Sequence, residues 1–509
     1  MDVGRLKKDV LDGVINVDRL IELVVTSQRE LQAAKQQLDQ AKQRIADLER
    51  QGGGSSQKLA EPFSVRAEER REQDRGKQRR RRKPRKKGGR KTTATKLALA
   101  ARTERVLPSG VPATACRLSH TRPVWRLEHG RAVLVAYEVY RGSNHQFGKI
   151  PGVLGRSEFA IEIVLAIAYQ VYVVGLSFDK VCLLMNFFQD LKLRKSQADA
   201  LFKQLARAWE GEFDPLCLLL ANSLVVQSDE TRWSIRSVWA FLSEKVRVVL
   251  FGVHKDAATL AELLDPATFA GIVISDDAAV YANFTHAQKC WAHLLRKAIK
   301  LTLLEPANAR YRRFTDRLLE IYRAACRVQS DKRLGDEGRR RKVFVLWHQL
   351  SDLVAAVWEA QLPPTEGPAD DYRLLCEEIM RLLLADQLFT FVTAEPVAQP
   401  NGNTMTVPGT NNESERTLRS AAQARVTGRT SKTVPGARRR TVIVSVLESL
   451  RTHLPSFTLS AVIEEVGHWF ETGQSCFSRL AEKLGLPPAV SRDDSGPSLL
   501  DRLLPVPSG

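Results

Sequence analysis

Residues 224–233 read LVVQSDETRW, and residues 271–277 read GIVISDD. Each is a short β-branched apolar run that ends in acids, Asp229 in the first and Asp276 and Asp277 in the second. Between them lie two further apolar runs, SVWAFLS and VRVVLFGV, and a helix-like stretch at 257–264. Three strands, a helix and a fourth strand predict a mixed α/β domain.

The acids at the strand ends indicate a possible metal site. In an α/β sheet the carboxyl ends of the strands are where side chains converge on a ligand, and carboxylates there suit Mg²⁺. Two Mg²⁺ ions about 4 Å apart can assist phosphodiester chemistry. The alternative is that the strand-end Asp residues only cap the following turn.

A third acid is available in NNESERTLR (411–419), which begins a predicted helix and offers Glu413 and Glu415. Residues two apart on a helix point in different directions, so only one of the two should be a metal ligand. Before that helix, residues 286–304 predict a short strand and a helix, and 306–390 are strongly helical. Helices are also expected from 413 to about 421 and from 437 to 453.

The N-terminal part predicts an interaction segment. Residues 17–48 carry apolar residues at heptad spacing, which favours a coiled coil and a homodimer; a single amphipathic helix folded back on the body is the alternative. After a Gly/Ser linker (51–56), eleven of the fifteen residues from Lys77 to Lys91 are Lys or Arg. We expect this tract to be disordered and to bind DNA, although such a run can also be a solvated face or a localisation tag.

Residues 117–150 predict a small β-ribbon, and residues 157–209 predict helices. The apolar run 159–178 contains Glu162, so we interpret it as a buried helix and not as a membrane span. A helical hairpin with its turn near 190–193 follows. Its second helix carries Arg194, Lys195 and Gln197, suitable for a helix-turn-helix that reads DNA, although hairpins that merely pack are common.

Composition narrows the class of protein. The 509 residues suggest roughly three or four domains, and 77 Lys+Arg against 58 Asp+Glu give a net charge of +19. Such an excess favours a partner rich in phosphate. Seven widely spaced cysteines argue against a secreted disulfide scaffold, and the N-terminus has no signal-peptide pattern. We expect a cytoplasmic, nucleoid-associated protein that does not enter the membrane.

Two groups of Cys and His residues offer candidate zinc ligands. His286, Cys290 and His293 supply three ligands, whereas structural zinc has four, so packing of Cys290 and Trp291 is the preferred interpretation and an approach of His293 to phosphate or metal is the alternative. Cys116 stands alone among scattered histidines, so the ribbon is expected to be metal-free.

Five motifs in order carry a resemblance to a known family: SDETRW, SDDAAVYANF, KCWAHLLRK, NNESERTLR and the segment 429–453. Together they resemble the large DDE transposase of the insertion sequence 66 family (TnpC type), over nearly the whole chain. The resemblance implies Mg²⁺-dependent cleavage and joining of DNA at transposon ends, with two ions and Mn²⁺ as a possible substitute. It matches Asp229, Asp276 and Glu415 to the three acids, with His293, Glu413 and Asp277 as possible supporting residues.

The implied fold is a multidomain α/β protein with an RNase H-like mixed-sheet catalytic domain and an all-α insertion. The expected parts are a coiled coil, a linker with the basic tract, a β-ribbon, a helix-turn-helix-like region, the first part of the catalytic core, the helical insertion, the last part of the core and a helical tail. They are assigned to residues 1–50, 51–97, 98–155, 156–215, 220–304, 305–398, 399–455 and 456–509.

The expected partner is DNA, both transposon ends and target, with accessory transposition proteins possible. The residues assigned to DNA contact are basic or polar: Lys77, Arg79, Arg80, Arg81, Arg82, Lys83, Arg85, Lys86, Lys87, Arg194, Lys195, Gln197, Arg416 and Arg419. Two alternatives use the same residues. One is a metal-dependent, structure-selective nuclease without joining activity, and the other is a DNA-binding protein whose catalytic site has decayed.

Overall fold

A computed structural model of the chain describes residues 92–361, 363–487 and 497–505, with scattered positions between 22 and 40. The chain divides into two units, Met1–Gly88 and Gly89–Gly509. In the first unit the described positions are helical and exposed. The residues that would form the coiled-coil seam, such as Val24, Leu31 and Leu38, lie outside the described residues, as does the basic tract to Lys91. The coiled coil, the dimer and the role of the tract therefore stay predictions.

The second unit begins with helix α4 (Thr93–Leu97) and a three-stranded sheet made of β1 (Arg102–Val106), β2 (Cys116–Glu128) and β3 (Arg131–Gly142). Strands β2 and β3 form an antiparallel hairpin, and β1 adds to β3 in parallel. The hairpin turn is His129-Gly130, both with positive φ, which matches the right-handed twist of the strands. The predicted β-ribbon is thus confirmed and gains a third strand.

The helices that follow are α5 (Ile161–Ala168), a π-helical turn η2 (Tyr169–Val173), α6 (Phe178–Gln189), α7 (Lys195–Trp209) and α8 (Phe213–Ala221). The apolar run predicted as one buried helix is α5 together with η2, and most of its side chains are buried. Within the described residues, none of the helices combines the length and apolar character that a membrane crossing requires. Helix α6 ends at Asp190 in the left-handed conformation, so the predicted hairpin turn is confirmed.

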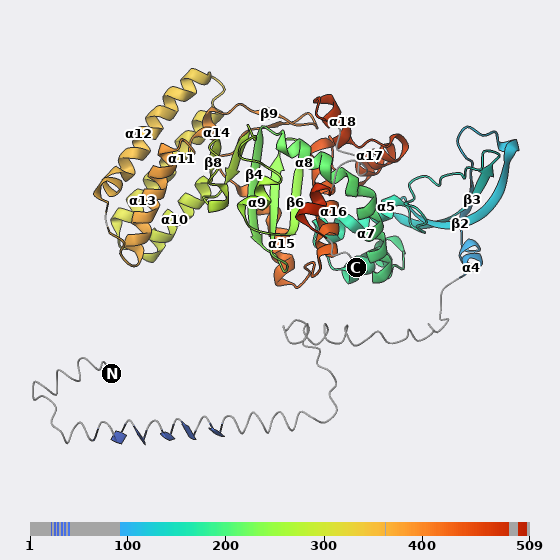
Figure 1. The fold of residues 1–509 in the computed structure, drawn as a ribbon, viewed down its shortest axis with the longest axis horizontal. Helices are drawn as coiled ribbons and strands as arrows, with labels where there is room; N and C mark the ends of the chain where they lie inside the picture. Colours follow the sequence, from blue (N-terminus) through green and yellow to red (C-terminus); the bar gives the residue numbers. More distant parts are fainter. Residues whose placement is uncertain are drawn as a thin grey trace, which may run out of the picture. The chain divides into compact units, whose positions relative to one another are not determined.

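A five-stranded mixed sheet lies at the centre of this unit (Figure 1). Its strands are β4 (Val225–Arg232), β5 (Ser237–Ser243), β6 (Arg247–Val253), β7 (Ile272–Ser275) and β8 (Ala287–Lys289), in the order β6-β5-β4-β7-β8. Strands β4, β5 and β6 are antiparallel neighbours, whereas β7 and β8 run parallel to β4. Helix α9 (Ala257–Ala261) lies between β6 and β7 in sequence, which confirms the predicted mixed α/β domain.

Helix α16 (Val434–His453) covers the β6 edge of this sheet. Thr441, Ser445 and Ser449 stand four residues apart on one face of α16, and their hydroxyl oxygens accept the backbone N–H groups of Phe251, Val249 and Arg247 at 2.9–3.0 Å. The hydroxyl groups of α16 therefore accept the backbone N–H groups of edge strand β6, which in the middle of a sheet would bond to another strand.

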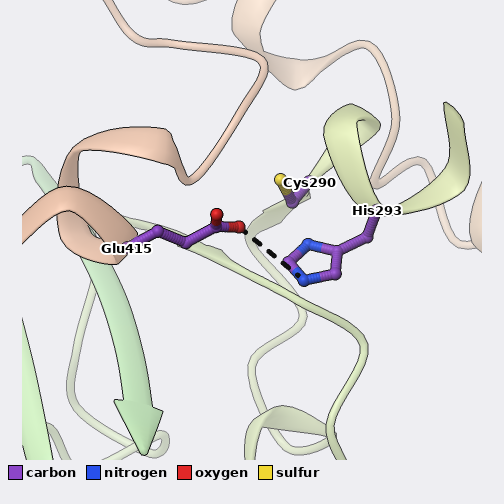
Figure 2. A group of neighbouring side chains, drawn as sticks. All are labelled: Cys290, His293 and Glu415. Atoms are coloured by element: carbon purple, nitrogen blue, oxygen red, sulfur yellow. Dashed lines mark ion pairs between the residues drawn. The ribbon is translucent and has the colours of Figure 1, made fainter. Parts of the chain in front are cut away.

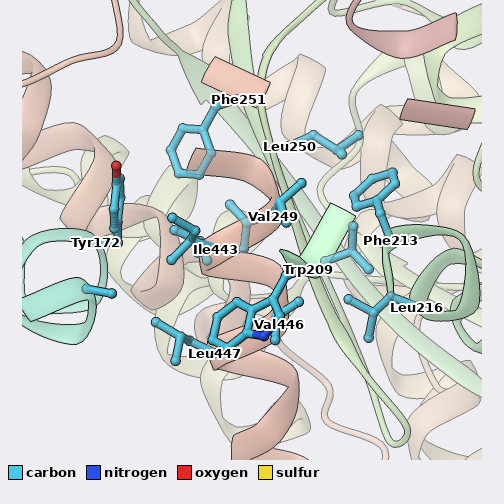
Figure 3. Packing of buried hydrophobic residues seen from close by; sticks show 14 of the residues in the cluster. Tyr172, Trp209, Phe213, Leu216, Val249, Leu250, Phe251, Ile443, Val446 and Leu447 are labelled. Atoms are coloured by element: carbon cyan, nitrogen blue, oxygen red, sulfur yellow. The ribbon is translucent and has the colours of Figure 1, made fainter. Parts of the chain in front are cut away.

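The main apolar core lies where α16, α7 and α8 meet the sheet. Figure 3 shows Val249, Leu250 and Phe251 of β6 packed with Ile443, Val446 and Leu447 of α16 and with Trp209 and Phe213. These side chains are almost completely buried, and each contributes about 1.5–3 kcal/mol relative to an exposed position. The core fixes the sheet, and through it the ends of the strands that carry the acids.

Helix α10 (Trp291–Leu304) follows β8 and packs with a helical insertion that shares its core. The insertion consists of α11 (Ala309–Ser330), α12 (Asp336–Ala360), α13 (Pro368–Leu384) and α14 (Thr390–Thr393), seen with α10 as a bundle beside β8 in Figure 1. Trp347 is half-buried, and the apolar residues of α11 and α12 at helical spacing are buried: Phe314, Leu318, Ile321, Ala325, Leu350, Val354 and Val357.

After the insertion come two short strands, β9 (Val397–Ala398) and β10 (Thr404–Met405), and helix α15 (Asn412–Val426). Helix α15 was predicted to end near residue 421, but good helix formers in AAQAR extend it by about one turn. The C-terminal elements are α17 (Leu459–Thr472), α18 (Cys476–Lys483) and α19 (Leu499–Leu503).

Candidate active site

Two of the three candidate acids lie on neighbouring parallel strands. In the register of β4 and β7, Val226 pairs with Val273 and Gln227 with Ile274. Two residues further along, the same register brings Asp229 beside Asp276. Asp276 directly follows β7, whereas Asp229 lies within β4, because antiparallel pairing with β5 carries β4 on to Arg232. The expectation that Asp229 ends its strand is therefore wrong, but the two acids meet where β7 ends, on the side of the sheet where ligands of α/β proteins bind.

The third acid, Glu415, comes from the first turns of α15, which packs against β4 and β5. Asn411, the residue before the helix, is completely buried. Its side-chain amide donates to the Ser228 carbonyl at 2.7 Å, and its backbone N–H donates to Cys290 Sγ at 3.1 Å. Asn411 thereby fastens the start of α15 to the residue before Asp229 and to the start of α10.

The electrostatics of Asp229 indicate that the three acids are close. Burial raises the pKa of its carboxyl group from an ordinary 3.8 to about 7, and repulsion from Glu230, Asp276 and Glu415 adds to the effect of burial. No ion pair of Asp229 is found within the described residues. A cation that binds beside such a buried carboxyl group stabilises its ionised form.

Glu415 has a cation and an imidazole as neighbours. Arg296 of α10 donates to Glu415 Oε1 at 2.6 Å, and His293 Nε2 lies 3.7 Å from the same oxygen (Figure 2). Burial lowers the pKa of His293, although Glu415 and Asp276 oppose that effect. Its Nδ1 is buried and finds no hydrogen-bond partner in the described part of the chain.

Asp276 partly fits the capping alternative. Its carboxylate accepts the backbone N–H of Ala278 at 3.1 Å, so it does close the turn after β7. The second carboxylate oxygen accepts no hydrogen bond from the described residues. Beneath this turn the ammonium group of buried Lys289 donates to the Asp276 carbonyl at 3.1 Å and to Ser275 Oγ at 3.2 Å. Capping and metal binding are therefore compatible at Asp276.

The two supporting acids, Asp277 and Glu413, point elsewhere. Asp277 forms an ion pair with Arg381 of α13. Glu413 accepts from Arg416 at 2.6 Å and from Arg247 of β6 at 3.3 Å. The structure thus places Glu415, and not Glu413, on the side of α15 that faces Asp229 and Asp276. Helical spacing predicts that the two glutamates point in different directions, and the family resemblance selects Glu415.

A buried network behind Asp229 was missed by the sequence reasoning. The Tyr281 hydroxyl donates to Glu230 at 2.6 Å and lies 3.0 Å from Ser228 Oγ, while Lys255 pairs with Glu230 at 2.6 Å. Glu230 raises the pKa of Lys255, as do Asp276 and Asp229 more weakly. The signal in the sequence was the alternation of side chains along a strand, which puts Glu230 on the opposite face of the sheet from Asp229. A carboxylate buried on that face needs a hydrogen-bond or ion-pair partner.

An open pocket of about 640 Å³ lies beside Asp276, the one of the three acids that lines it. Its lining also includes Asp277 and His293, and Trp358 and Arg381 of the insertion. The insertion therefore forms a wall beside the strand ends.

The predicted DNA contacts are distributed over several surfaces. Arg194 precedes α7, Gln197 accepts the Arg194 backbone N–H at 3.0 Å, and Lys195 pairs with Asp179 at 2.6 Å, so all three begin or brace the helix. Arg416 and Arg419 are exposed on α15. The assigned residues from Lys77 to Lys87 lie outside the described residues, and no finding tests any of these contacts.

Comparison with known proteins gives one match. The family model described as "Transposase IS66 family" matches residues 157–439, which is more than half of the chain. This segment includes Asp229, Asp276 and Glu415 together with the helical insertion. A search of curated proteins finds no match.

Proposed function

Because the chain belongs to the IS66 family of transposases, we propose that it cuts transposon ends and joins them to target DNA as a DDE enzyme. Asp229, Asp276 and Glu415 would be its three catalytic acids. The observation that carries the proposal is their convergence from β4, from the end of the parallel strand β7 and from helix α15.

We assign the central sheet to the RNase H-like fold that the family resemblance implies. Three features support this assignment: the strand order β6-β5-β4-β7-β8, the antiparallel directions of the first three strands, and the parallel directions of the last two. The insertion α11–α14 also lies between the second and third acids in the chain, as the resemblance implies.

The acids fit Mg²⁺, with Mn²⁺ as a substitute. Their donor set is carboxylate oxygen, which Mg²⁺ prefers. Burial raises the pKa of Asp229, and the repulsion from neighbouring acids that adds to this effect is what a divalent cation relieves. When bound, two such ions supply an activated oxygen nucleophile and stabilise the leaving oxygen. Asp229 would hold them from within β4, Asp276 from the end of β7, and Glu415 from a helix fastened by Asn411.

We assign DNA affinity to the basic surfaces and not to the acids. Arg419 is exposed and makes no ion pair among the described residues, while Arg416 keeps a largely exposed guanidinium group. The basic tract would add affinity without sequence information, and the N-terminal heptads would pair two subunits. Binding should therefore weaken steeply with salt, whether or not Mg²⁺ is present.

The test is single-strand and double-strand cleavage of DNA carrying the terminal inverted repeats of the element, with Mg²⁺. Asp229→Asn should abolish cleavage and leave DNA affinity nearly intact, whereas Asp277→Asn should keep most of the activity. Cleavage by Asp229→Asn would contradict the assignment. A strand-transfer product distinguishes the transposase from a nuclease that only cuts, and DNA binding without any Mg²⁺-dependent product would indicate a decayed site.

A further inference from the structure

A second set of possible metal ligands overlaps the three acids. Cys290 Sγ, a ring nitrogen of His293 and a carboxylate oxygen of Glu415 all lie within 4.8 Å of one another. Figure 2 shows the imidazole of His293 facing the Glu415 carboxylate, with the thiol of Cys290 beside the gap between them. The sequence pattern groups Cys290 and His293 with His286. In the structure the third residue of the group is instead Glu415, which comes from helix α15.

The donor atoms of this group select a different cation from Mg²⁺. Sulfur and imidazole nitrogen with one carboxylate oxygen is a typical zinc set, whereas Mg²⁺ takes oxygen ligands. Tetrahedral zinc, with bonds of about 2.0–2.3 Å, keeps its ligand atoms roughly 3.3–3.7 Å apart. His293 Nε2 and Glu415 Oε1 already stand at 3.7 Å. The thiol needs a movement of only about 1 Å to complete the set.

The surroundings leave these donors available. Cys290 precedes α10 and His293 is three residues later, so both face the same side of the helix start. Neither ring nitrogen of His293 is held by a hydrogen bond within the described residues: Nε2 lies 3.7 Å from Glu415 Oε1, and Nδ1 is buried without a partner, which is unusual for a buried polar atom. Cys290 Sγ accepts the Asn411 N–H at 3.1 Å, a contact that also stabilises a thiolate.

Arg296 is the competitor for this site. Its guanidinium group holds Glu415 at 2.6 Å, but the side chain is 54% exposed and can turn to solvent. A cation that binds Glu415 must displace this contact, so Arg296 weakens metal binding by repulsion as well as by occupying the carboxylate.

We propose that Cys290, His293 and Glu415 form a site for Zn²⁺, and that its occupation inhibits DNA cleavage by drawing Glu415 away from Asp229 and Asp276. Binding would release the thiol proton to solvent and leave a fourth position for water. The inhibition, unlike the binding, rests on the function proposed above.

Cobalt absorption tests the binding on the full-length protein without DNA. Co²⁺ follows zinc in its ligands and gives a thiolate-to-metal charge-transfer band in the near ultraviolet when Cys is bound. The wild-type protein should show this band, Zn²⁺ should remove it, and an excess of Mg²⁺ should not. Absence of the band in the wild-type protein would overturn the proposal.

Variants of single residues locate the site. Cys290→Ser should lose the band, and His293→Gln should bind Co²⁺ at least about 100-fold more weakly, since loss of even a supporting contact costs 10–100-fold. The matched controls Cys326→Ser and His286→Gln should keep it. Arg296→Gln should bind roughly fivefold more tightly, which a misfolded variant could not imitate. A full band in Cys290→Ser, or equal losses in His286→Gln and His293→Gln, would contradict the assignment.

The inhibition is measured separately as cleavage in Mg²⁺ with increasing Zn²⁺. Arg296→Gln should need less Zn²⁺ than the wild-type protein, and His293→Gln should need more, each relative to its own uninhibited rate. A cobalt band without Mg²⁺-dependent cleavage would refute the proposed function and not the zinc site. Cleavage that no Zn²⁺ concentration affects selectively would refute the inhibition.

Discussion

The two sides of α15 carry the same residue type in opposite circumstances. On one side Glu413 lies among cations: Arg416 and Arg247 bind it, and Arg247 is also 3.8 Å from Glu448. On the other side Glu415 joins Asp229 and Asp276. Within the described residues, the ion-pair partners of these three acids are Arg296, 2.6 Å from Glu415, and the His293 imidazole, 3.7 Å from it. A carboxylate paired with cations of the protein, such as Glu413, contributes to the fold. Carboxylates that lie together with few such partners are stabilised by a bound cation, and this difference distinguishes Glu413 from the candidate ligand Glu415.

The largest expected effect comes from exchanging the two glutamates for glutamine. Glu415→Gln should lower the rate of DNA cleavage by at least about 10³-fold, because a lost metal ligand removes several kcal/mol of transition-state stabilisation. Glu413→Gln should lower it less than about tenfold. Single-turnover cleavage of end DNA measures both, and similar losses in the two variants would end the distinction between the two sides.

Asn411 tests whether the placement of Glu415 matters. Asn411→Ala removes the 2.7 Å hydrogen bond to the Ser228 carbonyl and should destabilise the fold by about 1–3 kcal/mol. Cleavage should fall roughly 10–100-fold through misplacement of α15, while DNA affinity stays unchanged. Asn412→Ala, at the exposed next position, is the control. Equal effects of the two substitutions would show that Asn411 does not position the helix.

The pH dependence of stability tests the crowding of the acids. Because the folded pKa of Asp229 is about 7 against an ordinary 3.8, the folded protein holds this proton more tightly than the unfolded chain. Its stabilising effect is complete below about pH 4 and is lost as the pH rises through about 7. Asp229→Asn, which cannot ionise, should therefore be more stable than wild type at pH 8 in metal-free buffer, by about 4 kcal/mol.

The difference in stability between Asp229→Asn and the wild-type protein should become smaller as the pH is lowered. Thermal unfolding at pH 8 and pH 5 measures the difference, with Asp316→Asn on α11 as the control for the loss of one acidic side chain. If Asp229→Asn is less stable than wild type at pH 8, the ionised Asp229 carboxylate already has stabilising partners in the fold and does not need a bound cation.

The smallest effect is expected on the exposed face of α15. Arg419→Ala should weaken DNA binding about threefold and reduce the slope of affinity against salt by about one, as expected for one lost phosphate contact. Lys483→Ala on α18 provides a matched loss of one exposed cation. A smaller salt slope for Arg419→Ala than for Lys483→Ala would place α15 at the DNA. Equal salt slopes for the two variants would exclude Arg419 from the contact surface.

Much of this arrangement could be predicted from local patterns. Apolar runs located β4 to β7, and the acids that follow those runs pointed to Asp229 and Asp276, although β4 continues beyond Asp229. Helical spacing predicted that only one of Glu413 and Glu415 is a ligand, and the family resemblance selected Glu415. The chain order of five motifs indicated the family that residues 157–439 match.

The remainder depends on contacts that no local pattern contains. Arg296 reaches Glu415 across 119 residues, and Asn411 reaches Ser228 across 183. The Tyr281–Glu230–Lys255 network joins three separate elements, and the replacement of His286 by Glu415 beside His293 requires the fold of the whole insertion. Strand β1 was missed because RTERV is short and charged and pairs with β3 from outside the hairpin.

Manganese binding tests the central claim most directly, since it reports the ions and not the product. Electron paramagnetic resonance of Mn²⁺ titrated into the protein bound to end DNA should show two bound ions for the wild-type protein and for Glu413→Gln. Asp229→Asn, Asp276→Asn and Glu415→Gln should each lose at least one ion while the DNA remains bound. Full Mn²⁺ occupancy in those three variants would contradict the assignment of Asp229, Asp276 and Glu415 as the metal ligands.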